Sequence, residues 1–184
     1  MITLRDLDVV EYIKEHRVAK TSTIQKLFYP SYPVAARRLA ELVRCEYLKR
    51  ERDNLNMEYV YYIKRPKQLR HAVLLSDFLQ RLSEQVDIKK TVIEPQFGDI
   101  RPDAAVGYEL SEIAHIALIE VEVSHKGFDH AKYKNLVWEK FFPMQPELFI
   151  ISDGKIGDTG LKQTVIKTNL DFKISAPASY QKNY

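Results

Sequence analysis

The sequence predicts a mixed α/β (α+β) chain of 184 residues in two domains, residues 1–66 and 67–184. Residues 1–66 show three helix-periodic segments followed by two strand-like runs, and residues 67–184 alternate between helical and strand-like segments. The first range also holds 13 Lys and Arg against 9 Asp and Glu, whereas the second holds 15 against 16. A basic part joined to a nearly neutral one is a modest sign of nucleic-acid contact. The alternative is an ordinary solvated surface.

The composition and the motifs that the sequence lacks argue against several classes of protein. With 45% hydrophobic and 29% charged residues, the chain has an ordinary globular composition. No apolar run approaches the roughly 20 residues that a membrane span needs, and the amphipathic pattern starts at once, so we expect no membrane segment and no signal peptide. The single cysteine, Cys45, fits a reducing cytoplasm. The chain has no Gly-x-x-x-x-Gly-Lys-Ser/Thr loop and no His-x-His pair, which argues against an ATPase and against a relaxase enzyme.

The first two helices are expected from their caps. Thr3 is a suitable N-cap with Asp6 three residues on, and the first helix should run to about Arg17. Thr21 or Ser22 is expected to cap a short second helix, which a following proline ends.

A third helix is expected to open at Ser31-Tyr32-Pro33, because proline is favoured in the first helical turn. Its apolar stripe leaves Arg37 and Arg44 on the opposite side. Two strand-like runs follow, at 46–52 and 57–63. Three helices and a hairpin are the order of a winged helix-turn-helix, whose third helix enters the major groove of DNA while the hairpin touches the backbone. The candidate DNA-binding residues are Ser31, Tyr32, Arg37, Arg38, Arg44, Lys49, Arg50 and Arg52. The alternative is a domain of this kind that binds protein instead.

The second domain is expected to begin with a long helix from about Gln68 to Val86. After it we expect strands at 88–94, 102–108 and 113–123, a helix at 128–142, a strand at 148–151, a weaker helix at 161–168 and a last strand at 172–175. The order αβββαβ is that of the PD-(D/E)xK nuclease core, although several unrelated α/β folds begin in the same way.

Two carboxylates mark the third of these strands. Glu120 and Glu122 fall on one face of an otherwise apolar segment, where they need a compensating charge. A divalent cation such as Mg²⁺, held by Asp103 and Glu120, is one solution and could orient water for phosphodiester attack. An active site would then use Asp103, Glu120, Glu122 and Lys126. The other solution is pairing with the nearby cations Arg101, Lys126 or Lys132.

The nuclease motif is incomplete in this chain. It needs a lysine two residues after its glutamate, where this chain has Glu122, and Lys126 lies four residues further on. We therefore expect the second domain to be non-catalytic and to need no cofactor.

Several segments, in order, resemble the replication-relaxation proteins of Gram-positive plasmids and integrative elements. They are Leu4-Arg5-Asp6, Leu27-Phe28-Tyr29-Pro30-Ser31, Ala35-Ala36-Arg37-Arg38-Leu39, Leu69-Arg70-His71-Ala72 with Ser76-Asp77, Arg101-Pro102-Asp103-Ala104, Ile119-Glu120-Val121-Glu122 and Lys132-Tyr133-Lys134. The resemblance implies a winged helix-turn-helix fused to a nuclease-like domain. It also implies an accessory protein that binds specific double-stranded DNA in plasmid or mobile-element replication, relaxation or conjugative transfer, beside a relaxase or replication initiator.

Two other functions stay open from the sequence. One is a metal-dependent nuclease, and the other is a transcriptional repressor whose second domain dimerises. A homodimer is expected in either DNA-binding case, because helix-turn-helix proteins often read two half-sites.

Overall fold

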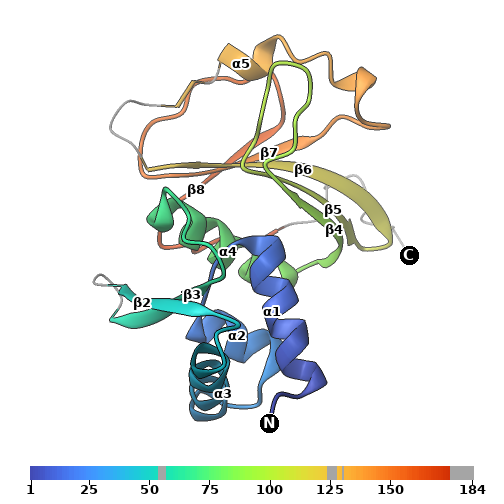
Figure 1. Cartoon of the computed structure of the whole chain (residues 1–184). Coiled ribbons are helices and arrows are strands. Elements are labelled where there is room, and N and C mark those ends of the chain that lie inside the picture. Colours follow the sequence, from blue (N-terminus) through green and yellow to red (C-terminus); the bar gives the residue numbers. More distant parts are fainter. Residues whose placement is uncertain (54–56, 124–127, 130, 175–184) are drawn as a thin grey trace. The chain divides into compact units, whose positions relative to one another are not determined.

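The computed structural model describes residues 1–53, 57–123, 128–129 and 131–174 of a mixed α+β protein (Figure 1). Its internal contacts divide the chain into two compact units, Met1–Gln80 (unit 1) and Arg81–Tyr184 (unit 2). This division falls inside a helix, fourteen residues after the junction at Pro66 that the sequence suggested. Within the described residues no helix is both long and apolar enough to cross a membrane.

Unit 1 begins with three helices, α1 (Leu4–His16), α2 (Thr21–Phe28) and α3 (Tyr32–Arg44). The predicted cap of α1 is confirmed: Thr3 and Asp6 bond reciprocally to each other's backbone in a capping box. This arrangement gives side-chain acceptors to two N–H groups at the start of the helix, where the regular helical acceptors are missing.

The start of α2 differs from the prediction. Lys20 is its N-cap and the helix already includes Thr21 and Ser22, so the expected capping by either of these residues is wrong. The backbone N–H and the hydroxyl of Ser22 donate instead to the carboxylate of Glu58, at 2.5 and 3.0 Å. A side chain distant in sequence thus replaces the local cap.

A small antiparallel sheet completes the first part of unit 1. It contains β1 (Ala19–Lys20), β2 (Lys49–Asp53) and β3 (Glu58–Tyr62), in the order β1-β3-β2. The hairpin strands were predicted, but the two-residue β1 was not. In the register of the hairpin Arg50 lies opposite Tyr61.

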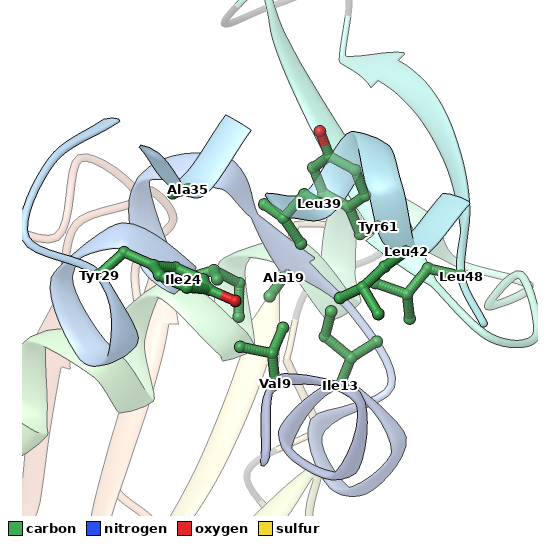
Figure 2. Close-up of a cluster of buried hydrophobic side chains, with 10 residues drawn as sticks. All are labelled: Val9, Ile13, Ala19, Ile24, Tyr29, Ala35, Leu39, Leu42, Leu48 and Tyr61. Atoms are coloured by element: carbon green, nitrogen blue, oxygen red, sulfur yellow. The ribbon is translucent and has the colours of Figure 1, made fainter. Parts of the chain in front are cut away.

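One apolar cluster joins the three helices to this sheet (Figure 2). Each fully buried Leu or Ile stabilises the fold by about 1.5–3 kcal/mol. The cluster fixes which side of α3 faces inward, since Ala35, Leu39 and Leu42 are completely buried. Its members are Val9, Ile13, Ala19, Ile24, Tyr29, Ala35, Leu39, Leu42, Leu48 and Tyr61.

Helix α4 (Leu69–Ser83) lies within the predicted range 68–86 and contains the boundary between the two units. Its unit 1 part is held to α2 by Asp77. The carboxylate of Asp77 accepts hydrogen bonds from Lys20 Nζ at 2.5 Å and from the Thr23 hydroxyl at 2.9 Å.

Unit 2 is built around a five-stranded sheet in the order β4-β5-β6-β7-β8 (Figure 1). The first three strands, β4 (Asp87–Ile93), β5 (Ala104–Leu110) and β6 (Ile113–Glu122), form an antiparallel meander. Strands β7 (Glu147–Ser152) and β8 (Gln163–Ile166) add on in parallel.

The prediction of one helix over residues 128–142 is wrong. Among the described residues of that segment the structure forms a one-turn helix α5 (Ala131–Lys134) and a 3₁₀ turn η1 (Trp138–Lys140). The aromatic residues suggested helical spacing. However, Leu136 and Phe142 pack against the apolar core from the irregular connection, so burial does not require one continuous helix.

The two C-terminal predictions are also wrong. The segment 161–168 contains β8 rather than a helix, in keeping with its β-branched residues. The described part of the expected strand 172–175 is not a strand, and residue 175 lies outside the described residues. The Gln85 side chain forms hydrogen bonds with the backbone of this segment. It donates to the Phe172 carbonyl at 3.3 Å and accepts from the Ile174 N–H at 2.9 Å.

Candidate functional site

α3 presents a line of four exposed side chains, Pro33, Arg37, Ala40 and Arg44, which we call the α3 ridge. At about 100° per residue they lie within roughly 60° of one another, opposite the buried stripe. Arg37 makes no ion pair or hydrogen bond with any residue that the structure describes. Arg44 donates two hydrogen bonds to the Glu41 carboxylate, at 2.9 and 2.6 Å. The two ridge arginines are therefore not equivalent.

Arg38 is not part of the ridge. Its guanidinium is bonded to the buried carboxylate of Asp6 through Nε, at 2.9 Å, and through a second nitrogen. Asp6 also accepts from the Tyr29 hydroxyl at 2.7 Å and from Thr3. Burial alone would raise the pKa of Asp6, but the hydrogen bonds from Arg38, Thr3 and Tyr29 outweigh it and hold the pKa well below its usual range. Arg38 therefore fastens α1 to α3.

Ser31 and Tyr32 lie at the N-terminal end of α3. Ser31 is the N-cap residue and makes no side-chain capping bond, while the Tyr32 side chain is half exposed. The free N–H groups of a helix start can bind phosphate, so both residues lie where a backbone contact to DNA is chemically suitable.

Strand β2 carries three exposed cations, Lys49, Arg50 and Arg52. The guanidinium of Arg50 lies over the ring of Tyr59, 4.3 Å from its centroid, which restrains the side chain. Lys49 and Arg52 form no ion pair with any residue in the described part of the chain. These cations are available for anionic groups outside the molecule.

In unit 2 the β5–β6 hairpin brings Asp103 beside Glu120. Ser111 and Glu112 form its tight turn, both with positive φ. The register pairs Ala104 with Ile119, and the Asp103 N–H donates to the Ile119 carbonyl at 2.9 Å. Continuing this register by one residue places Asp103 opposite Glu120.

Both carboxylates make hydrogen bonds within the protein. Asp103 Oδ2 accepts the backbone N–H of Val121 at 2.7 Å. Glu120, which is 7% exposed, accepts the hydroxyl of Tyr133 and lies 2.7 Å from Lys132 Nζ. Lys132 is among the nearby cations that the sequence offers as partners for Glu120. Nothing local in the sequence shows that the Tyr133 hydroxyl reaches Glu120.

Burial dominates the electrostatics of this cluster. It raises the pKa of Glu120, and the bonds from Lys132 and Tyr133 offset that effect only in part, while the charge of Asp103 adds to it. Burial and the neighbouring Glu120 likewise raise the pKa of Tyr133. Compared with water, the site therefore disfavours the charged form of Glu120.

The remaining candidates are less closely gathered. Glu122 ends β6, half-buried and in register with Ser152 of β7. Arg101 pairs with Glu94, and Lys126 lies outside the described residues.

Lys132 and the Tyr133 hydroxyl both contact Glu120 at Oε1, so a divalent cation at that oxygen would have to displace the ammonium group. Nowhere in the described residues do three or more His, Cys, Asp and Glu side chains gather so as to hold a metal ion. A shallow hollow in unit 2, lined by residues 83–88 and 109–111, lies at the opposite end of the β4–β5 pair from Asp103.

Comparisons with known proteins assign no family. No family model and no curated protein matches the chain. Among solved structures it is similar to the restriction endonuclease FokI, with 11% identity and a TM-score of 0.37. The match covers 90% of this chain and 42% of that enzyme, so the chain spans about two fifths of its length.

Proposed function

We propose that the chain is a double-stranded DNA-binding protein that contacts the duplex through unit 1. In this proposal unit 1 is a winged helix-turn-helix: α3 enters the major groove and the β2–β3 hairpin is the wing that follows the backbone. The order α1-β1-α2-α3-β2-β3 supports it, as does the sheet in which β1 pairs with β3.

The observation that carries the proposal is the chemistry of the α3 ridge. One side of α3 packs against the core, and the other side exposes Arg37, which has no partner in the described structure. Such a guanidinium can bind guanine edges or phosphate. Lys49 and Arg52 on β2 extend the positive surface within the same unit. Neutralising phosphates with such cations releases counterions and makes binding depend steeply on salt.

For unit 2 we propose a nuclease-like core that has no catalytic role. The meander β4-β5-β6 followed by the parallel strand β7 agrees with the αβββαβ core in strand order, although the crossover is mostly irregular. The ion pair between Glu120 and Lys132 supports a structural use of the carboxylate, with no cofactor.

The wider role follows from the resemblance to replication-relaxation proteins. We propose an accessory factor, acting in the cytoplasm as a homodimer, that binds a specific duplex site in a plasmid or mobile element. Its protein partner would be a relaxase or a replication initiator. If footprinting protected only the gene's own promoter and not an origin of replication or transfer, the repressor alternative would replace this role.

The experiment is a selection of preferred sites by the full chain from a pool of random duplexes, followed by a salt titration of the selected site. The proposal predicts an enriched sequence, with affinity that falls steeply as salt rises. Absence of any duplex binding at low salt would refute it.

A second candidate function is a metal-dependent nuclease. The gathering of Asp103, Glu120 and Lys132 at one end of the β5–β6 pair favours it, because acidic groups and a lysine are what phosphodiester hydrolysis uses. Incubating plasmid with Mg²⁺ or Mn²⁺ decides the matter. Nicking that is lost in Glu120→Gln establishes an enzyme, and intact plasmid under both metals excludes this one.

A further inference from the structure

The α3 ridge has a definite chemical order along its axis. Its exposed members, from the N-terminal end, are Pro33, Arg37, Ala40 and Arg44. Arg37 and Ala40 are three residues apart, which is about 4.5 Å along a helix axis. Neighbouring base pairs are stacked about 3.4 Å apart, so these two side chains are spaced to meet adjacent pairs.

Arg37 is the ridge cation that can bind a base without first losing a contact. It has no intramolecular bond with any described residue, whereas Arg44 is bonded to Glu41 by two N–H groups. If Arg44 made a bidentate contact to a base, it would lose its two hydrogen bonds to Glu41. A single contact to phosphate would leave those two hydrogen bonds in place. A guanidinium that is free and exposed matches the paired O6 and N7 acceptors of guanine.

Ala40 gives the centre of the ridge a methyl group. A larger polar side chain at this place would hold the helix away from the groove floor, and it would seek a hydrogen bond of its own. Ala36, on the flank of the ridge, is also small and is half-buried. The methyl of an exposed alanine is complementary to the C5 methyl of thymine, which is the apolar group of the major groove.

We infer that α3 reads a guanine through Arg37 and an adjacent thymine through Ala40, and that Arg44 contacts phosphate. The preferred site then contains a G·C pair next to an A·T pair whose thymine methyl faces the helix. This inference rests on the proposed binding of duplex DNA by α3.

Modified bases in the selected duplex test the inference on the wild-type full chain. Replacing the guanine by 7-deazaguanine removes the N7 acceptor and keeps O6, so affinity is expected to fall severalfold, by part of the value of a bidentate base contact. Replacing it by inosine changes only the minor-groove edge and is expected to leave affinity unchanged. Replacing the thymine by deoxyuridine, which removes only the methyl group, is expected to weaken binding severalfold.

Two matched variants assign the residues. Arg37→Lys keeps the charge but loses the planar fork, so the preference for guanine and the response to 7-deazaguanine should both weaken. Arg44→Lys is the same substitution on the same ridge, and it should keep both. Ala40→Gly should lose the response to deoxyuridine, with thermal unfolding measured alongside because glycine weakens a helix. If Ala40→Gly fails to fold, the wild-type response to deoxyuridine still decides the thymine contact.

The outcomes separate the inference from the proposed function. No binding to any duplex overturns both. Binding without sequence preference, a preference unaffected by Arg37→Lys, or equal affinity for thymine and deoxyuridine probes overturns the inference alone. Loss of the guanine preference in Arg44→Lys instead of Arg37→Lys also overturns it.

Discussion

The ammonium group of Lys132 lies 2.7 Å from the carboxylate of Glu120, and it joins α5 to a buried position of β6. A carboxylate among apolar side chains must be compensated or protonated. In this protein Lys132 compensates it in part, with the Tyr133 hydroxyl as a second donor.

The pKa of Glu120 predicts how stability depends on pH. Because burial raises the pKa in the folded state, the protonated form is favoured by folding. This contribution is complete below the ordinary value of 4.5 and is lost as the pH rises through the raised value. Glu120→Gln mimics the protonated form, so we expect it to be more stable than the wild type at pH 7 and equal to it in acid.

Thermal unfolding between pH 4 and pH 8 measures this difference. Glu112→Gln, at the exposed hairpin turn, is the matched control and should follow the wild type throughout. A Glu120→Gln variant less stable than the wild type at pH 7 would show that the ion pair with Lys132 outweighs burial.

Asp6 predicts the opposite dependence. Its folded pKa is depressed, so its contribution is present above the ordinary value of 3.8 and is lost as the pH falls toward the depressed value. Asp6→Asn breaks a buried pair with Arg38 and should cost on the order of 3 kcal/mol at pH 7. Asp8 is an exposed carboxylate on the same helix, so Asp8→Asn is the control. Its free energy of unfolding in urea should differ from that of the wild type by less than about 0.5 kcal/mol. A loss in Asp6→Asn that persists undiminished well below pH 3.8 would contradict the electrostatic explanation.

The cations of β2 are expected to supply affinity without specificity. Replacing Lys49 or Arg52 by alanine should weaken binding to all duplexes alike and lower the salt slope by about 1. Lys140→Ala, an exposed lysine of unit 2, removes the same charge and should leave the slope unchanged. Titration of affinity against salt for the three variants checks this. Loss of sequence preference in the β2 variants would mean that the strand reads bases.

Much of unit 1 could be predicted from the sequence because its signals are local. The Thr3 and Asp6 cap, the proline at the start of α3 and the hairpin strands all follow from neighbouring residues. The two-residue β1 could not be predicted, since it exists only through pairing with β3. The anchoring of Arg38 by Asp6 is also a tertiary contact, 32 residues apart in sequence.

In unit 2 the strands were predictable and their connections were not. Alternation and apolar runs located β4 to β7, and the register then brought Asp103 to Glu120. The aromatic residues between β6 and β7 imitate helical spacing but pack from an irregular segment. Hydrophobic periodicity alone does not show whether a short apolar segment forms a helix or a strand. This explains the wrong prediction of a helix at β8.

The most direct test of DNA binding by α3 is the equilibrium affinity of the full chain for its selected duplex, with Arg37→Ala and Lys140→Ala measured beside the wild type. We expect Arg37→Ala to lose roughly 5- to 150-fold in affinity while it unfolds at the wild-type temperature, and Lys140→Ala to bind normally. Equal affinity of the wild type and Arg37→Ala would contradict the assignment of α3 as the element that reads DNA.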